Sequence, residues 1–213
     1  MPAQKAQIPP TAFDPIKATE KIWLREKKTE QYHLSFGVKA FGENDDRFPA
    51  LKVLGVILGG NMSARMFQNV REEKGLCYSI RTQVDEYSDT GLITTRAGVK
   101  LSDAARAIEA IRYEYDQIRE SGISESELEK AKNYLIGKTD LATEDTEEVA
   151  HEFAKNQLLY SSTDDLEDWK QKILKVDKDT VNQLAQELFV PKNFRFAGIG
   201  SGLSEAEVGK FMV

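Results

Sequence analysis

Residues 59–80 read GGNMSARMFQNVREEKGLCYSI and give the clearest local signals in the chain. Two glycines open the stretch, an amphipathic segment follows, and Gly75 separates that segment from residues with strand character. Arg71 precedes this glycine by four residues, and Tyr78 follows it by three. Because glycine readily adopts the left-handed backbone that closes many helices, we expect a helix over about 63–74 and a strand directly after it.

Arg71 and Tyr78 are candidate site residues, because a helix-to-strand turn would bring a guanidinium and a phenol close together as two hydrogen-bond donors. Each also has an ordinary structural interpretation. Arg71 would be a solvated cation that stabilises the C-terminal end of its helix. Tyr78 shares the alternation of Leu76 and Ile80, which predicts a core or rim aromatic. Neither residue alone indicates a function.

The flanking segments predict a sheet and buried helices. Residues 32–40 alternate between apolar and polar side chains, as in a half-buried strand, and a strand over 21–28 could pair with them. Dense apolar residues over 48–58 predict a largely buried helix that Gly59 and Gly60 end. In the helix over 63–74, the expected buried stripe consists of Met66, Phe67 and Val70.

The remaining pattern predicts an α+β fold with one antiparallel sheet covered on one face by helices. In chain order, the further expected elements are strands over 76–87 and 90–99, a helix through 104–118, a helix capped by Ser124 and Glu127, helices over 146–160, 164–174 and 177–189, a strand over 194–199, and a terminal helix capped by Ser204 and Glu207. We expect one domain over residues 21–213. Residues 1–20, rich in Pro, Gln and Ala, predict a connector from a missing N-terminal half.

Composition excludes several classes of function. The 213 residues carry a formal net charge of −6, and no run of Lys and Arg forms the basic stripe expected of a nucleic-acid or anionic-membrane surface. No stretch of about 20 apolar residues exists, so no membrane span is expected. The single cysteine, Cys77, has no evident base beside it and fits a reducing compartment, with the cytoplasm as the default.

The same stretch resembles the C-terminal, metal-free half of the insulinase, pitrilysin and mitochondrial-processing-peptidase family of zinc peptidases. In that family, this half contributes an arginine and a tyrosine seven residues apart in a string similar to R-x-x-x-G-L-x-Y. Arg71, Gly75, Leu76 and Tyr78 occupy these positions here. The family's preceding helix is also matched, by Gly59, Gly60, Ser63, Arg65 and Phe67. The resemblance covers nearly the whole chain after residue 20 and implies a processing-peptidase-like sandwich.

The resemblance implies that Arg71 and Tyr78 bind a peptide substrate and stabilise the oxyanion that forms during its hydrolysis. The zinc ion of the complete enzyme would lie on an N-terminal zinc-bearing half, or on a partner subunit of the same fold. We therefore expect a zinc metalloendopeptidase only in the full-length protein, and no activity from this chain alone.

This chain lacks the family's H-x-x-E-H zinc motif and has only two histidines, His33 and His151. Glu147 lies four residues before His151, so the two side chains could share one helix face. Together they supply two ligands where a catalytic zinc needs three, and a solvated histidine on an acidic helix is the simpler interpretation. We assign no metal to this chain.

Two other interpretations remain open. The chain could be a non-catalytic scaffold or peptide-binding subunit of the same fold, in which Arg71 and Tyr78 persist without chemistry. It could also be an α+β ligand-binding module outside the family. An H-x-x-E-H motif in the parent reading frame upstream would favour the peptidase half.

Overall fold

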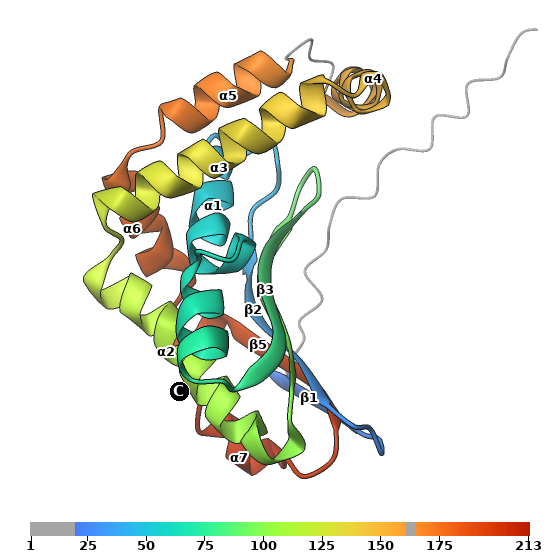
Figure 1. Cartoon of the computed structure of the whole chain (residues 1–213), viewed down its shortest axis with the longest axis vertical. Coiled ribbons are helices and arrows are strands. Elements are labelled where there is room, and N and C mark those ends of the chain that lie inside the picture. The colour runs from blue at the N-terminus through green and yellow to red at the C-terminus, as the bar shows by residue number, and fades with distance from the viewer. Residues whose placement is uncertain (1–19, 161–164) are drawn as a thin grey trace, which may run out of the picture.

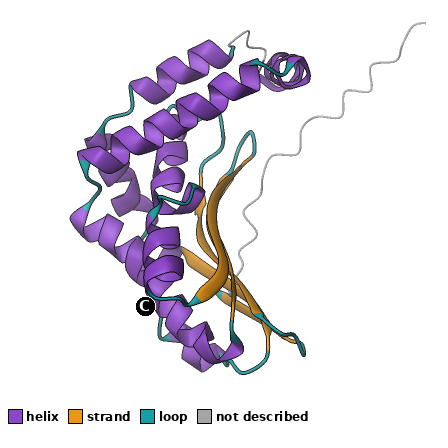
Figure 2. Ribbon diagram, viewed as in Figure 1, coloured by secondary structure: helices purple, strands orange, loops and turns teal. Residues whose placement is uncertain are grey.

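A computed structural model of the chain describes residues 20–160 and 165–213, which form one five-stranded sheet with helices on one side of it (Figure 1, Figure 2). Most of the predicted connector, residues 1–19, lies outside the described residues. The strands are β1 (Ile22–Glu26), β2 (Tyr32–Ala40), β3 (Cys77–Glu86), β4 (Gly91–Val99) and β5 (Phe194–Gly200). The α+β class predicted from the sequence is confirmed.

The sheet order is β1-β5-β2-β4-β3, so the expected pairing of the first two strands is wrong. β5 lies between them, pairing antiparallel with β2 and parallel with β1, which makes the sheet mixed. The reason is burial. Phe194 and Phe196 of β5 are buried and need a partner strand on each side, whereas no residue of β1 is fully buried, as suits an edge strand.

The helices follow the predicted order, with π-helical or 3-10 turns at several of their ends. They are α1 (Phe48–Gly55), η1 (Val56–Gly60), η2 (Met66–Glu73), η3 (Leu101–Asp103), α2 (Ala104–Ser121), α3 (Glu125–Thr143), α4 (Thr146–Lys155), η4 (Asn156–Tyr160), α5 (Leu166–Leu174), α6 (Lys178–Leu188), η5 (Pro191–Asn193) and α7 (Glu205–Gly209). α1, α2 and α6 lie beside the sheet, while α3, α4 and α5 form the end at the top of Figure 1.

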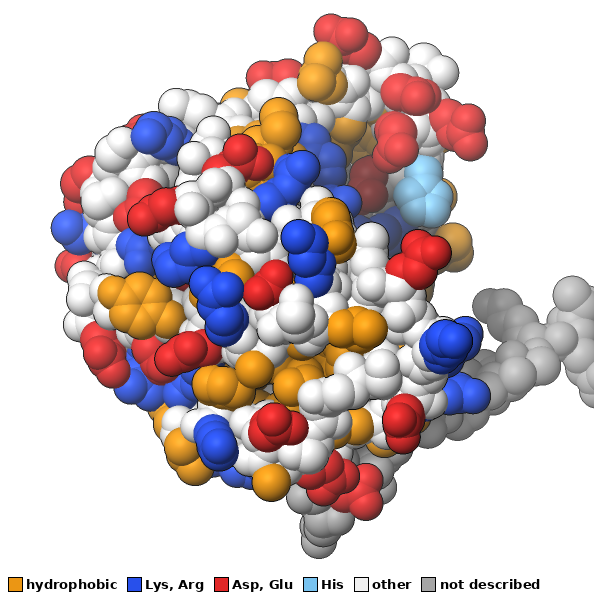
Figure 3. Space-filling view, turned by 60° about the horizontal axis from the view of Figure 1, so that its bottom comes forward, with side chains coloured by type: hydrophobic (Ala, Val, Ile, Leu, Met, Phe, Trp, Pro, Cys, Tyr) orange, Lys and Arg blue, Asp and Glu red, His pale blue; other side chains and the backbone are white. Residues whose placement is uncertain are grey.

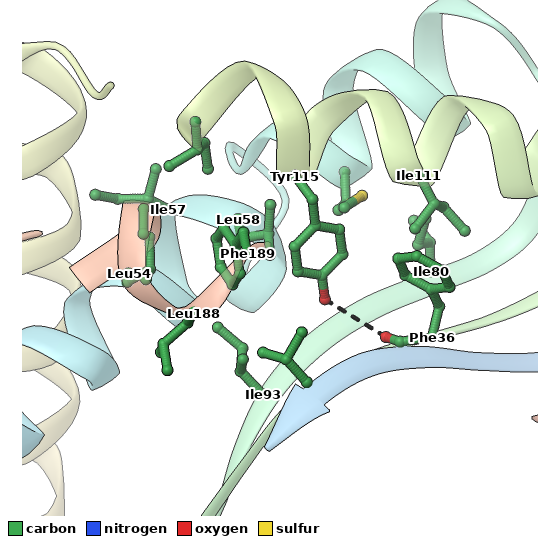
Figure 4. Close-up of a cluster of buried hydrophobic side chains, with 14 of the residues drawn as sticks. Phe36, Leu54, Ile57, Leu58, Ile80, Ile93, Ile111, Tyr115, Leu188 and Phe189 are labelled. Carbon is green, nitrogen blue, oxygen red and sulfur yellow. Dashed lines mark hydrogen bonds between the residues drawn. The ribbon is translucent and has the colours of Figure 1, made fainter. Parts of the chain in front are cut away.

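An aromatic cluster joins α2 to the covered face of the sheet (Figure 4). The Tyr115 ring lies 4.7 Å from Phe189 and 5.2 Å from Phe194, centroid to centroid, and Phe194 stacks on Phe36 at 4.8 Å. The Tyr115 hydroxyl is within 2.9 Å of Thr95 Oγ1, so the phenol is both buried and hydrogen-bonded. Edge-to-face rings add about 0.5–1.5 kcal/mol each beyond the area that they bury.

The capping box predicted at Ser124 is confirmed, and it also fixes a long-range ion pair. The Ser124 side chain accepts a hydrogen bond from the Glu127 amide, and the Glu127 carboxylate accepts one from the Ser124 amide. The same carboxylate accepts hydrogen bonds from Arg65 Nε at 2.6 Å and Nη2 at 3.0 Å. Burial opposes ionisation of Glu127, but these hydrogen bonds outweigh it and lower the pKa to about 2.

We expect Gly75→Ala and Gly137→Ala to shift stability in opposite directions. Gly75 has φ +62°, and a Cβ there would meet no atom within 4 Å, so the substitution costs about 1–2 kcal/mol from backbone strain alone. Gly137 lies inside α3 with equally open space, so alanine should add about 0.5–1 kcal/mol of stability there. Urea unfolding measures both values, and an unchanged midpoint for Gly75→Ala would contradict the assignment.

Glu127→Gln should destabilise the chain by about 1.5–3 kcal/mol at pH 7, because it removes the charge that Arg65 and the capping box bind. The pKa of Glu127 in the folded chain lies below the ordinary value of 4.5, so its carboxylate stabilises the fold above about pH 4.5 and loses this effect as the pH falls toward 2. The difference in unfolding free energy between the variant and the wild type should therefore shrink below pH 4.5.

The matched control is Glu125→Gln, in the same first turn but with a side chain that is 70% exposed. Surface substitutions of this kind usually change stability by less than about 0.5 kcal/mol. If Glu127→Gln changes the unfolding free energy as little as Glu125→Gln does, or by an amount that does not depend on pH, the ion pair contributes nothing to stability.

Candidate functional site

Arg71 lies at the C-terminal end of η2, with its side chain partly exposed and the helix anchored below it. Met66 and Val70 are buried against the core, so the opposite side of the helix faces outward. The Arg71 guanidinium lies 4.6 Å from the centroid of the Phe67 ring, and its Nε is 3.9 Å from a carboxylate oxygen of Glu72. A cation over an aromatic ring gains about 0.5–1 kcal/mol at an exposed site, which favours one orientation of the guanidinium.

Phe67 therefore has a different position from the one predicted. The sequence pattern placed it in the buried stripe of the helix with Met66 and Val70, but the ring is only half-buried and supports Arg71. The spacing of four residues between Phe67 and Arg71 was the available signal, because side chains at this spacing are neighbours on a helix surface.

The chain turns from η2 into β3 through Gly75, as predicted. The Gly75 amide donates to the Arg71 carbonyl at 3.1 Å, and the Leu76 amide donates to the Val70 carbonyl at 3.1 Å. Each bond spans one residue more than in the Schellman motif that ends many helices, because η2 is π-helical throughout.

Tyr78 is exposed, and the interpretation of it as a core or rim aromatic on the face of Leu76 and Ile80 is wrong. The strand register pairs Cys77 with Val99 and Ser79 with Gly98, so Tyr78 stands opposite no residue of β4. This β-bulge inserts one residue and shifts the alternation. The result is that Cys77 takes the buried position, while the Tyr78 side chain is 51% exposed.

Arg71 thus lies in the last turn of η2 and Tyr78 is the second residue of β3, on either side of one helix-to-strand junction. The Arg71 charge acts on the Cys77 thiol, the direct neighbour of Tyr78. Burial raises the pKa of Cys77 to about 11, and the nearby arginine lowers it by a smaller amount. Cys77 is therefore protonated at neutral pH, which agrees with the expectation that it is no nucleophile.

The two histidines lie on different elements. His33 is on β2 and His151 is on α4 beside Glu147, and all three side chains are exposed. Within residues 20–160 and 165–213, no group of three or more His, Cys, Asp or Glu side chains could hold a metal ion. The described residues therefore do not fit a catalytic zinc, which needs three protein ligands.

A hollow of about 750 Å³ lies among α1, α3, α4 and α5 and is lined by neither Arg71 nor Tyr78. Its charges largely pair with each other, as in Lys52 with Glu86 and Lys155 with Glu43, both at 2.8 Å. Acidic and basic side chains are also interspersed over the face shown in Figure 3. None of the described helices is long and apolar enough to cross a membrane.

Comparison with known proteins identifies relatives over most of the chain. A family model described as the peptidase M16 inactive domain matches residues 2–135. An uncharacterized zinc protease of Streptomyces coelicolor is 32% identical over 187 residues, which cover 88% of this chain and 41% of that protein. The uncharacterized zinc protease YmxG of Bacillus subtilis is 36% identical over 171 residues, 80% of this chain and 42% of that protein. The chain thus spans less than half the length of these relatives.

Solved structures share the fold. The peptidase M16 inactive domain from Pseudomonas fluorescens superposes with a TM-score of 0.77 at 17% identity, over 86% of this chain and 44% of that one. A chain of Complex III2 from Candida albicans superposes with a TM-score of 0.76 at 18% identity, over 90% of this chain and 48% of that one. Together with the family match, these findings confirm the resemblance inferred from Arg71, Gly75 and Tyr78. The chain belongs to the M16 family of peptidases, and it corresponds to the inactive domain of that family.

Proposed function

We propose that this chain is the metal-free half of a zinc-dependent processing endopeptidase, and that Arg71 and Tyr78 bind the peptide substrate and stabilise the oxyanion formed during its hydrolysis. The observation that carries the proposal is the β-bulge, which exposes the Tyr78 phenol beside the end of the helix that bears Arg71. The Tyr78 hydroxyl has no hydrogen-bond partner among the described residues, so it is available to a substrate.

The chemistry needs donors of this kind. When a peptide carbonyl is attacked, its oxygen gains negative charge, and donors that are already oriented toward it lower the barrier. Arg71 would offer a permanent charge and a planar set of N–H donors, and Tyr78 one O–H donor. The Phe67 ring under Arg71 restricts the guanidinium before the substrate arrives.

Zinc, when bound, would polarise the carbonyl and activate water. Because the described residues offer no ligand set, we place the zinc on an N-terminal half or on a partner subunit of the same fold. Both sequence relatives described above are named zinc proteases and extend well beyond the matched region, which supports this arrangement. A cytoplasmic location fits the single free thiol.

The second candidate function is a non-catalytic scaffold or peptide-binding subunit. It is favoured by the occurrence of the same fold in a chain of Complex III2 from Candida albicans. In that case Arg71 and Tyr78 would bind peptides without catalysis, or would have no catalytic role at all.

Tyr78→Phe and Arg71→Ala should each lower peptide hydrolysis by the full-length protein about a hundred- to a thousand-fold, the usual effect of losing one oxyanion donor. Zinc content should stay the same, because neither residue is proposed as a ligand of the metal. Steady-state kinetics on unstructured peptides and metal analysis measure the two quantities.

Matched controls are Tyr113→Phe and Arg106→Ala, since both side chains lie on α2 and are exposed. The controls should retain wild-type turnover. If both site variants keep activity within about twofold of the wild type, the catalytic proposal is wrong. If the full-length protein binds peptides but hydrolyses none, the scaffold function replaces the catalytic one.

A further inference from the structure

The sheet has one face that none of the described helices covers, and basic side chains gather there. Figure 1 and Figure 2 show the helices on one side only. Along β2, β4 and β5, buried residues alternate with residues that point to the uncovered side. The strand register places these outward positions, and those of β1 and β3 paired with them, in rows across the sheet. We call this surface the open face. Its cationic strand residues are Arg25, Lys39, Arg81, Arg96 and Arg195.

The open face has the opposite charge to the chain as a whole. Among its described strand positions, Asp85 is the one carboxylate, so five cations against one acid leave a formal charge of +4 there, in a chain of net charge −6. Asp85 accepts a hydrogen bond from Arg96 Nη2 at 3.1 Å, and its oxygens also face Gln83 and Thr94. This carboxylate is therefore already engaged.

Two of the arginines face each other across neighbouring strands. Arg81 and Arg96 form a direct cross-strand pair, which places their Cα atoms about 4.5–5.5 Å apart. Like charges in this arrangement destabilise a sheet. Asp85 neutralises Arg96, whereas Arg81 has no carboxylate partner within the described residues. An exposed guanidinium beside a like charge is a ready partner for a carboxylate from outside, because its planar donors match the two oxygens.

The open face is continuous with the proposed site. Ser79 is the next residue after Tyr78, and a Cβ placed on Gly98 would lie 3.2 Å from Ser79 Oγ and 3.7 Å from the His33 ring, so both side chains lie on this face. Arg81 follows Tyr78 by three residues, a span of about 10 Å along a strand. An extended peptide that reaches Tyr78 and runs along β3 would therefore bring a residue about three positions from its scissile bond near Arg81.

We propose that the open face selects peptide substrates with acidic side chains, and that Arg81 is the residue that recognises a Glu or Asp about three positions from the cleaved bond. This inference rests on the proposed function, since it assumes that the peptide engages Tyr78. A nucleic acid is the other polyanion to consider. It is disfavoured because the face adjoins a peptidase-family site and because Trp23 is the one large aromatic side chain among the face's described strand positions, where single-strand binding uses several stacking rings.

The test compares matched peptides that carry Glu or Gln at one position, two to four residues on either side of the cleaved bond. The full-length protein should prefer the Glu peptide by about two- to fivefold in kcat/KM, the equivalent of one solvent-exposed ion pair. The preference should fall as salt rises from about 0.05 to 0.5 M. Arg81→Gln should reduce the Glu/Gln ratio to about one, and Arg81→Glu should reverse it in favour of a Lys peptide.

The matched control is Arg106→Gln, which should keep the wild-type ratio. The Arg106 side chain is 68% exposed and lies on α2, on the helix-covered side of the sheet and not on the open face. A wild-type ratio near one, or a ratio that Arg81→Gln leaves unchanged, would overturn the inference. Tighter binding of a labelled single-stranded RNA than of the Glu peptide, lost in Arg81→Gln, would overturn it in favour of a nucleic acid.

The outcomes for the two proposals can be told apart. If Tyr78→Phe abolishes hydrolysis while Glu and Gln peptides are cleaved equally, only the charge preference fails. If Tyr78→Phe has no effect, the proposed function fails. Fluorescence anisotropy of labelled Glu and Gln peptides with the wild type and Arg81→Gln then decides whether the face binds acidic peptides without catalysis. Equal affinities in that measurement would overturn the inference as well.

Discussion

The described helices cover one face of the sheet, and the packing of Tyr115 from α2 into the aromatic cluster with Phe36, Phe189 and Phe194 holds them there. The Tyr115 phenol is fully buried, and its hydroxyl is hydrogen-bonded to Thr95 Oγ1. Thr95 Oγ1 is in turn 2.7 Å from Thr82 Oγ1. A buried hydroxyl without a partner would be destabilising, so this chain of hydroxyls ties α2 to β4 and β3 in one orientation. None of the described helices covers the opposite side of the sheet.

The helix-to-strand junction depends on this arrangement. Because η2 buries Met66 and Val70 and β3 buries Cys77 and Ile80, the chain has to turn sharply between the two elements. The turn is made by the one residue there that tolerates a positive φ, Gly75. A bulge one step later leaves Tyr78 outside the ladder. The features that expose the phenol are thus consequences of burying its neighbours, and the resulting surface is the one that we propose for substrate binding.

Acidic and basic side chains occupy different parts of this molecule, and the net charge alone does not show this separation. The first turns of α3, α4 and α5 carry acidic residues, where the helix dipole stabilises them. Basic residues occupy the outward positions of the strands. A net charge of −6 argued against a basic surface, yet five cations share the open face, because strand alternation and sheet register collect residues from distant parts of the chain. The sequence showed the alternation around Arg81, Arg96 and Arg195, but it did not show that the three strands carrying them lie in one sheet with these side chains on the same face.

Local periodicity was enough to determine the strand over 32–40, the buried helix after it, the capping box at Ser124 and the glycine that ends η2, because each of these depends on contacts between residues close in the chain. The motif around Arg71 and Tyr78 likewise pointed to the family, because its residues lie in one contiguous stretch. The tertiary structure alone decided that β5 separates β1 from β2 and that a bulge moves Tyr78 from the core side to the surface. These outcomes depend on which distant strands compete for burial and on a one-residue shift in register, and neither is encoded in the spacing of nearby residues.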